Sequence, residues 1–475
     1  MKRLYFIGIG GTAMGAVAGA CVEAGFIVGG SDAQVYPPMS DFLHAKGIHY
    51  TDGFQENSIT YFSPDIVVVG NAISRGNPEL EAALDNRFTL VSMSELIRNE
   101  FIQQHTSIVI TGTHGKTSTS SLAAWMFASA QKPTGFLIGA ITGNFGLGCR
   151  LVPNNEQGYF ISEGDEYDTA YFDKRSKFML YRPDIAIINN IEFDHADIFS
   201  SLAEIKRSFR LFARLVPRNG VIIANGEDSN VADIISTVFA TVETFGLDSS
   251  CYWRAVDIHY GETETYFTVL KNGLIFSRFT SPLAGEYNIR NTLAVIAAAH
   301  REGITKEQIQ EALTTFKLPK RRLEEIASWN GATVVDDFAH HPTAIAVTLK
   351  AITQRYPNRR IIACFEPRSN TTTRSFFQNE LARCFDDADI ICIGAPNRPE
   401  RYSESDRLNT DKLAHELQSQ GKKVFAISTE QAQTGSWGND MLDFLQKTVQ
   451  PNDVIVLLSN GDFNGLRSSL KVQQV

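Results

Sequence analysis

TGTHGKTST, residues 111–119, resembles a phosphate-binding loop that is two residues short. The usual loop reads G-x-x-x-x-G-K-[ST], whereas here only Thr113 and His114 stand between the first glycine and the Gly115-Lys116-Thr117 ending. This departure points away from ordinary GTPases and ATPases. The stretch still predicts a phosphate ligand.

The sequence on either side of this loop supports phosphate binding. A buried strand over 107–110 precedes the loop and a helix follows it, which is the context that a phosphate loop requires. Backbone N–H groups can wrap the phosphates, Lys116 can offset negative charge at a transferred phosphoryl group, and Thr117 or Ser118 can hold Mg²⁺. The alternative is a glycine turn whose helix is capped by Thr117.

Composition bounds the class of protein. The chain has 475 residues, and at roughly 150 residues per domain we expect about three domains. No apolar run reaches the roughly 18 residues that span a bilayer, so we expect a soluble protein without membrane insertion. A formal net charge of −9 gives no electrostatic basis for a nucleic-acid partner. Six scattered cysteines without a C-x-x-C pair argue against a zinc or disulfide framework and favour the cytoplasm.

Strand-like apolar runs alternate with helical segments along most of the chain, which predicts parallel sheets with crossover helices. The runs lie at 4–9, 26–30 and 65–70, then at 107–113, 158–164, 184–190 and 220–226, and finally at 333–338, 360–367, 389–395, 423–427 and 453–459. Their grouping separates three α/β units.

The predicted class is therefore α/β with three domains. Between 251 and 282 the sequence changes to aromatic and β-branched runs broken by Gly261 and Asn272-Gly273, which predicts a small antiparallel sheet beside the central domain. The predicted domains are a Rossmann-like N-terminal domain over 1–105, a central phosphate-loop ATPase-like domain over 106–316, and a Rossmann-like, doubly wound C-terminal domain over 317–475.

A second glycine-rich turn, GIGGTAMG, lies at residues 8–15 between a strand and a helix. Gly8, Gly10 and Ala13 fit the dinucleotide pattern G-x-G-x-x-G/A, and Asp32 follows the second strand. The pattern is compatible with NAD or FAD, with another diphosphate, or with tight packing alone. A nicotinamide-dependent oxidoreductase is accordingly the main alternative from another functional class.

Acidic residues crowd the segment 162–178, which follows a predicted strand. For most of them we expect a solvated loop. A carboxylate at the C-terminal end of a parallel strand is placed to hold a metal opposite the phosphate loop, which favours Glu163. His195 follows the next strand, but imidazole is an unusual ligand for Mg²⁺, so the residues alone favour a supporting role for it.

Two polar pairs follow further along the chain. Asn288 and Asn291 are three residues apart on an apolar helix and share one of its faces, where they can contact a ligand or cap the helix start. TVVDDFAHHPTA (333–344) ends a strand in two acids and two histidines. Adjacent acids there can bond a ribose, although an exposed strand end would look similar.

Together these segments resemble the Mur ligase family, the ATP-dependent amide-forming enzymes of bacterial cell-wall synthesis. The resemblance covers essentially the whole chain, and it is closest to the branch that acts on UDP-N-acetylmuramate. The segments that carry it are GIGG, TGTHGKTST, NIEFDH, AGEYNIRN, KRRLE and DDFAHHPT. In that family the shortened loop is normal.

The resemblance implies roles for the matching positions. The implied catalytic residues are Lys116, Glu163, His195 and Arg210, with Thr117, Glu163 and His195 as Mg²⁺ ligands. The implied ATP-binding residues are Gly112, Thr113, His114, Gly115, Lys116, Thr117, Ser118, Asn288, Asn291, Arg322 and Asp337. The implied UDP-sugar-binding residues are Gly8, Gly10, Gly11, Thr12, Asp32, Asn71, Ala72, Ile73 and Ser74.

One family feature is displaced in this sequence. Several members carry a carbamylated lysine at the position that Arg210 occupies here, and Lys206 is the nearest lysine. We therefore expect Arg210 to supply its positive charge directly.

Two branches of the family share the first substrate and differ in the amine. One adds L-alanine, and the other adds the murein tripeptide L-alanyl-gamma-D-glutamyl-meso-diaminopimelate. Segments 165–183 and 365–371 resemble the tripeptide branch, in which Arg368, Ser369 and Asn370 are predicted to contact the peptide. L-Alanine is the alternative amine substrate. A non-catalytic nucleotide sensor is the third functional interpretation, after the ligase and the oxidoreductase.

Overall fold

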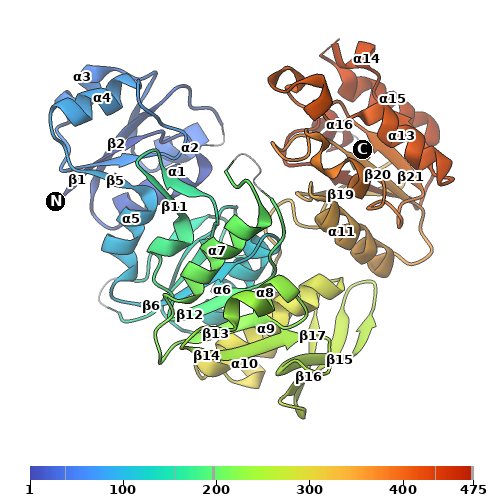
Figure 1. The fold of residues 1–475 in the computed structure, drawn as a ribbon, viewed down its shortest axis with the longest axis horizontal. Helices are drawn as coiled ribbons and strands as arrows, with labels where there is room; N and C mark the ends of the chain where they lie inside the picture. The colour runs from blue at the N-terminus through green and yellow to red at the C-terminus, as the bar shows by residue number, and fades with distance from the viewer. Residues whose placement is uncertain (38, 154–155, 195–197, 434, 472–475) are drawn as a thin grey trace.

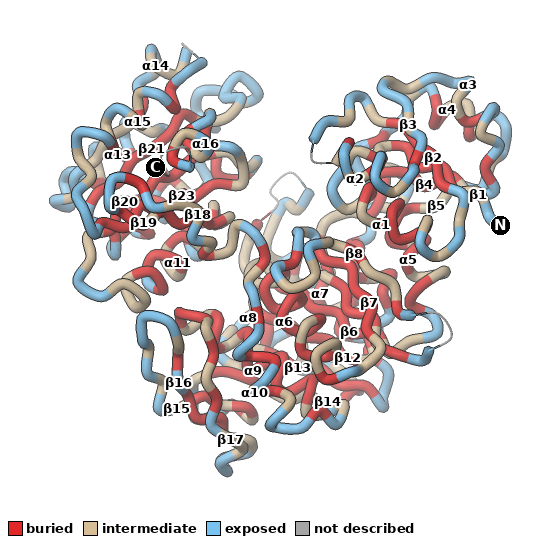
Figure 2. The backbone as a smooth tube through the Cα atoms, turned by 180° about the vertical axis from the view of Figure 1, so that it is seen from behind, coloured by how far each residue is buried: buried red, intermediate tan, exposed pale blue. Residues whose placement is uncertain are grey.

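Three α/β units make up the protein, as seen in a computed structural model that describes residues 1–475 except 38, 154–155, 195–197, 434 and 472–475. The N-terminal unit (blue) and the C-terminal unit (orange to red) each adjoin the central unit (green to yellow) and lie apart from one another (Figure 1). Each unit has its own sheet with buried strands, which appear red in Figure 2.

The first unit is a parallel sheet in the order β3-β2-β1-β4-β5. Its central strand β1 pairs on both sides, and Leu4, Phe6 and Ile7 are fully buried. Crossover helices cover both faces of such a sheet, which explains its continuous apolar runs. The strands are β1 (Arg3–Ile7), β2 (Ile27–Asp32), β3 (His49–Asp52), β4 (Ile66–Val69) and β5 (Leu90–Ser92). The helices are α1 (Thr12–Glu23), α2 (Met39–Ala45), α3 (Glu56–Phe62), α4 (Pro78–Asp85), α5 (Met93–Ile97) and a π-helix (Arg98–Ile102).

The central unit is built on a ten-stranded sheet in the order β17-β16-β15-β14-β13-β12-β6-β9-β7-β8. Its strands are β6 (Thr106–Thr111), β7 (Thr134–Leu137), β8 (Cys149–Arg150), β9 (Tyr159–Gly164), β12 (Ile185–Ile188), β13 (Val221–Asn225), β14 (Thr241–Gly246), β15 (Trp253–Tyr260), β16 (Thr265–Lys271) and β17 (Leu274–Ser281). Its helices are α6 (Lys116–Ser129), α7 (Leu202–Ala213), α8 (Ser229–Ile235), α9 (Glu286–Arg301) and α10 (Lys306–Thr315), with a 3-10 turn at Lys177–Leu180. A hairpin of β10 (Asp168–Ala170) and β11 (Asp173–Ser176) lies outside this sheet.

Strands β15, β16 and β17 are antiparallel, as the hairpin signals predict. They do not form a separate sheet, because β14 pairs with β15 and joins them to the parallel strands. The central sheet is therefore mixed. Apolar helix α9, whose residues Leu293–Ala299 are almost entirely buried, contacts both β13 and β15 and so bridges the two parts.

The third unit has a six-stranded sheet in the order β18-β19-β23-β20-β21-β22, parallel except for β18. Its strands are β18 (Glu324–Trp329), β19 (Ala332–Asp337), β20 (Ile361–Phe365), β21 (Ile390–Ile393), β22 (Lys423–Ala426) and β23 (Val454–Leu458). Its helices are α11 (Pro342–Arg355), α12 (Gln378–Leu381), α13 (Thr410–Ser419), α14 (Thr429–Gln433), α15 (Trp437–Thr448) and α16 (Leu466–Lys471), with 3-10 turns at Ser375–Phe377, Pro399–Arg401 and Glu404–Asp406. Helix α11 contacts α9 of the central unit.

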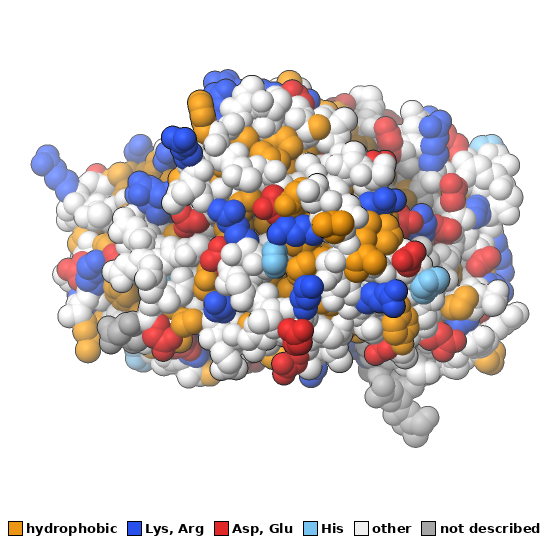
Figure 3. All heavy atoms as spheres, turned by 90° about the horizontal axis from the view of Figure 1, so that it is seen from below, with side chains coloured by type: hydrophobic (Ala, Val, Ile, Leu, Met, Phe, Trp, Pro, Cys, Tyr) orange, Lys and Arg blue, Asp and Glu red, His pale blue; other side chains and the backbone are white. Residues whose placement is uncertain are grey.

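The molecular surface is mixed in character. On the face in Figure 3, basic and acidic side chains are interspersed, with apolar side chains between them. Among the helices in the described part of the chain, none has both the length and the apolar character needed to cross a bilayer.

Candidate active site

The phosphate loop joins β6 to α6 and depends on two glycines in the left-handed region of backbone space. Gly112 has φ +140° and Gly115 has φ +81°. A Cβ on Gly115 would lie 3.0 Å from Oδ1 of Asn291 and 3.2 Å from Nδ2 of Asn189. Backbone conformation and close packing both favour glycine there. The loop thus turns sharply and presents its N–H groups at the start of α6.

We predict that Gly115→Ala lowers the free energy of unfolding by about 1–2 kcal/mol, because an L-residue is strained at positive φ. It should also weaken ATP binding, because the new methyl group pushes the Asn291 amide away from the loop. Gly303→Ala is the matched control: its φ is +75° and no atom lies within 4 Å of the added Cβ. Chemical denaturation and ATP titration measure the two effects, and equal ATP affinities in the two variants would contradict the prediction.

Lys116 is the first residue of α6 and its ammonium group lies over the loop. Its Nζ donates to the carbonyl oxygen of Gly112 at 2.7 Å and pairs with Oε2 of Glu166 at 2.8 Å. Burial alone would lower the pKa of Lys116, but the charge of Glu166 and neighbouring acids raises it above its ordinary value. A fully charged lysine therefore stands at the phosphate loop.

Thr117 connects the loop to the strand beside it and to the third unit. Its hydroxyl donates to Oε1 of Glu163 at 2.7 Å and accepts from Nη2 of Arg322 at 3.2 Å. The other oxygen of Glu163 accepts from the backbone N–H of Gly139 at 2.7 Å. Burial raises the pKa of Glu163, and nearby Asp165 raises it further. A hydroxyl and a carboxylate so close together are the oxygen ligands that Mg²⁺ prefers.

The asparagine pair after β12 holds the loop in place. Asn190 accepts from the backbone N–H of His114 at 2.7 Å and donates to the carbonyl oxygen of His114 at 3.2 Å. Asn189 donates to the hydroxyl of Thr119 at 3.0 Å. These amides tie the loop and the first turn of α6 to the end of β12.

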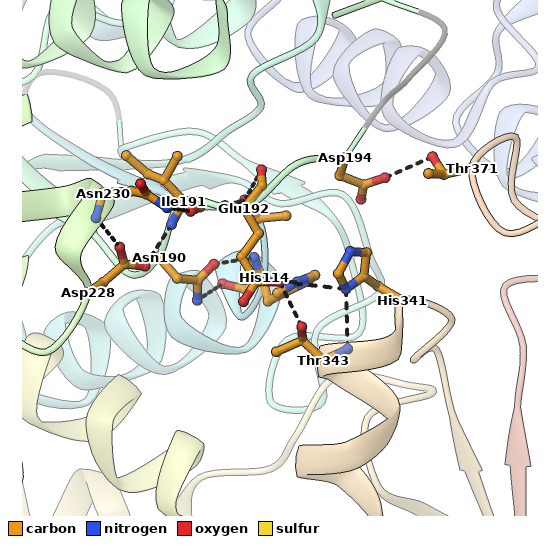
Figure 4. Close-up of polar contacts among 12 residues, drawn as sticks. His114, Asn190, Ile191, Glu192, Asp194, Asp228, Asn230, His341, Thr343 and Thr371 are labelled. Carbon is orange, nitrogen blue, oxygen red and sulfur yellow. Dashed lines mark hydrogen bonds and ion pairs between the residues drawn. The ribbon is translucent and has the colours of Figure 1, made fainter. Parts of the chain in front are cut away.

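Glu192 joins the loop to the start of α11 in the third unit (Figure 4). Its Oε2 lies 3.3 Å from Nε2 of His114 and accepts from the hydroxyl of Thr343 at 2.7 Å. The same oxygen lies 3.7 Å from Nδ1 of His341, whose ring is 4.7 Å from that of His114. Burial lowers the pKa of His341 to about 4. Partial burial opposes ionisation of Glu192, but the hydrogen bond and charge of His114 bring its pKa down to about 2.

A second contact between the units links the segment after β12, which also contains Glu192, to the segment after β20. The hydroxyl of Thr371 donates to Oδ1 of Asp194 at 2.9 Å. Of the predicted peptide contacts, Arg368 pairs with Glu366 and Asp462 at 3.3 Å each, and the hydroxyl of Ser369 bonds that of Thr372 at 2.7 Å. Arg368, Ser369 and Asn370 thus belong to a loop whose next residue, Thr371, lies against the central unit. Their contact with a peptide stays a prediction.

The predicted nucleotide residues of the later segments are buried polar groups. Asn288 and Asn291 lie in the first turns of α9, and Oδ1 of Asn288 and Nδ2 of Asn291 have no hydrogen-bond partner among the described residues. Asp337 ends β19, and its carboxylate accepts from the backbone N–H groups of Leu323 and Ala339 at 2.8 Å each. Buried amides with an unused atom suit a polar ligand.

The N-terminal glycine turn and the segment after β4 meet at the carboxyl end of the first sheet. A Cβ on Gly8, whose φ is +90°, would lie 3.4 Å from the side chain of Ile73. Asp32 braces the turn, since its Oδ2 accepts from the backbone N–H of Gly10 at 2.8 Å. The rest of the predicted sugar-nucleotide set follows from these two segments: Gly11 and Thr12 at the start of α1, and Asn71, Ala72 and Ser74 beside Ile73. The binding role of these residues stays a prediction.

Two predicted catalytic residues are not placed at the phosphate loop by the structure. His195 lies outside the described residues. Arg210 is on α7, where its Nη2 is 3.3 Å from Oδ2 of Asp233, which also pairs with Lys206. Its role in the chemistry stays a prediction.

Sequence reasoning missed several site residues. Glu166 falls in the segment expected to be a solvated acidic loop, yet it is 2% exposed and pairs with Lys116. Glu192, Thr343 and Thr371 were not singled out either. The signal for Glu192 is its position four residues beyond a buried parallel strand, at the sheet edge where sites form. The two threonines act across units, and no local pattern reveals such contacts.

Three segments of the chain match descriptions of one family. They are the Mur ligase family catalytic domain over residues 3–104, the Mur ligase middle domain over 110–299, and the Mur ligase glutamate ligase domain over 321–461.

Full-length relatives agree with this assignment. The UDP-N-acetylmuramate–L-alanyl-gamma-D-glutamyl-meso-2,6-diaminoheptandioate ligase of Haemophilus influenzae is 36% identical over 99% of this chain and 98% of its own length. A crystal structure of a murein peptide ligase from Psychrobacter arcticus covers 100% of both chains at 31% identity with a TM-score of 0.71. The UDP-N-acetylmuramate–L-alanine ligase of Acetivibrio thermocellus is 33% identical over 97% of this chain and 94% of its own length.

Three α/β units, with a phosphate loop in the central unit whose Thr117 bonds a carboxylate and an arginine, define a multidomain nucleotide-dependent enzyme. The chain belongs to the Mur ligase family. Members of this family are ATP-dependent ligases that form amide bonds, and they use ATP with Mg²⁺.

Proposed function

We propose that this protein joins the carboxylate of UDP-N-acetylmuramate to the amine of L-alanyl-gamma-D-glutamyl-meso-diaminopimelate at the expense of ATP, in peptidoglycan recycling. The observation that carries a ligase activity is the meeting of Lys116, Thr117, Glu163 and Arg322 at one phosphate loop. The tripeptide as amine is supported by the Haemophilus influenzae relative, which is 36% identical over nearly the whole chain.

The three units then divide the substrates among them. Residues 1–105 would bind the sugar nucleotide at the glycine turn of 8–12, 106–316 would bind ATP, and 317–475 would bring the peptide. The three separate sheets support this division. The contacts of Arg322, Thr343 and Thr371 with the central unit support a peptide site that faces the phosphate loop.

The reaction proceeds in two steps. An oxygen of the muramoyl carboxylate attacks the γ-phosphorus of ATP, the bond to the β-phosphate oxygen breaks, and ADP leaves. The alanyl amine attacks the resulting acyl phosphate at its carbonyl carbon, the C–O bond to phosphate breaks, and the nitrogen loses a proton. Lys116 and Arg322 stabilise the charge on the transferred phosphoryl group, and the loop's N–H groups orient it.

The residues around Thr117 fit Mg²⁺, because they offer one hydroxyl and one carboxylate that a backbone N–H already holds in position. Thr117 and Glu163 would hold the ion, with His195 as a third candidate from the sequence. When bound, it neutralises phosphate charge and aligns the β- and γ-phosphates.

Phosphate release from ATP, together with the mass of the product, tests the proposal. With UDP-N-acetylmuramate present, the tripeptide should support release at least about tenfold faster than the same concentration of L-alanine, because binding of the additional residues is available only to the tripeptide. If neither the tripeptide nor L-alanine supported phosphate release, the ligase assignment would be wrong.

L-Alanine is the second candidate amine, favoured by the Acetivibrio thermocellus relative at 33% identity. Rapid release with L-alanine and none with the tripeptide would select it. In that case the phosphate loop keeps its role and only the peptide assignment of Arg368, Ser369 and Asn370 is lost.

A further inference from the structure

We propose that His114, Glu192 and His341 form a binding site for a borderline divalent transition metal ion, Zn²⁺ or Co²⁺, which ties the third unit to the phosphate loop. The site is separate from the oxygen ligands Thr117 and Glu163. The proposed ligase activity uses Mg²⁺ and does not by itself require an ion at this second site.

The geometry of the three side chains is close to that of a metal site. Their ligand atoms all lie within 4.8 Å of one another, and one carboxylate oxygen of Glu192 is 3.3 Å from Nε2 of His114 and 3.7 Å from Nδ1 of His341. Ligands about 2.0–2.1 Å from a tetrahedral ion are separated by about 3.3–3.4 Å. The ligand atoms of the three side chains, which lie together in Figure 4, would therefore have to approach one another by at most about 1.5 Å to hold an ion.

The chemistry of the ligand set selects the kind of ion. Two imidazoles and one carboxylate are the three protein ligands of some catalytic zinc sites, in which water or substrate fills the fourth position. Mg²⁺ prefers oxygen ligands in an octahedron, so it should bind here weakly. The open position would lie beside the phosphate loop, where water or a phosphate oxygen can fill it.

The protein's own hydrogen bonds leave His341 incompletely satisfied. Its Nδ1 accepts from the backbone N–H of Thr343 at 3.3 Å, a long bond that an ion would replace. Only Nδ1 therefore has a lone pair to offer an ion, because Nε2, which is buried and has no partner among the described residues, carries the ring hydrogen. An ion at this site would require neutral imidazoles at both histidines and an ionised Glu192.

The site spans two units of the fold. His114 lies in the phosphate loop and Glu192 follows β12, whereas His341 is the N-cap residue of α11 in the third unit. The ion would be held only when the two units are in the arrangement seen here. Metal binding should therefore fix the third unit against the central one.

Co²⁺ binding to the full-length, metal-free protein tests the proposal. We expect one equivalent to bind with the intense visible bands of tetrahedral Co²⁺, to be displaced by Zn²⁺, and to resist a large excess of Mg²⁺. Glu192→Gln, His114→Gln and His341→Ala should each weaken binding by at least about tenfold. His259→Ala, which removes an exposed imidazole elsewhere, and His195→Ala should bind as wild type does.

Other outcomes would overturn the site. Octahedral spectra, binding only at millimolar metal, or affinity lost in His195→Ala but kept in the three ligand variants would each show that the triad is a hydrogen-bonded contact alone. Thermal unfolding without metal identifies variants that fail to fold. Because ligands come from both units, a folding defect in His341→Ala leaves His114→Gln as an independent test.

Discussion

Lys116→Ala is expected to abolish ATP-dependent ligation, with kcat lower by about 10³-fold or more, and to leave the binding of UDP-N-acetylmuramate intact. The magnitude follows from the loss of a charged group that faces the transferred phosphoryl group. The sugar nucleotide is proposed to bind at the glycine turn of 8–12, on a different sheet. Initial rates of phosphate release and calorimetric titration with the sugar nucleotide measure the two effects.

Folding and chemistry must be separated in this experiment, because Lys116 pairs with Glu166, which is 2% exposed. Removing one partner of a buried pair costs about 3–5 kcal/mol of stability. The double variant Lys116→Met/Glu166→Gln removes both charges, so it should recover stability without recovering activity. Lys412→Ala, an exposed lysine of the third unit, is the surface control. An active double variant would show that Lys116 serves the fold and not the reaction.

The sequence predicted most of the parallel fold because buried parallel strands read as uninterrupted apolar runs. The runs at 107–113, 158–164 and 184–190 correspond to β6, β9 and β12, which are neighbours in the central sheet. Short or polar strands contain no uninterrupted apolar run, so the sequence did not indicate them. Strand β3, HYTD, is mostly exposed, and β18 pairs antiparallel at a sheet edge.

The site residues, too, divide into those that the local sequence indicates and those that it does not. Lys116, Thr117 and Glu163 lie at the ends of apolar strands or in a glycine loop, so their local sequence indicates them. The link from Thr117 to Arg322 joins residues 205 positions apart. Contacts of this kind depend on how the third unit rests on the central one, which the alternation of apolar and polar residues does not encode.

Glu163→Gln is expected to lower kcat by about 10²–10³-fold and to raise the Mg²⁺ concentration needed for half-maximal activity. Glutamine keeps the shape of the side chain but removes the charge that would hold the ion. With its amide oxygen kept on the Gly139 N–H, glutamine presents an N–H donor to Thr117, whose hydroxyl then loses its acceptor on this side chain.

Two further variants separate charge from shape at this position. Glu163→Asp keeps the charge on a shorter side chain and should retain more activity than Glu163→Gln when Mg²⁺ is raised. Glu302→Gln changes a carboxylate whose Oε2 accepts from the hydroxyl of Tyr159 at 3.0 Å, and it should leave the Mg²⁺ dependence unchanged. An unchanged Mg²⁺ dependence in Glu163→Gln would assign the carboxylate to positioning Thr117, and the metal would then have to be held by other groups at the loop.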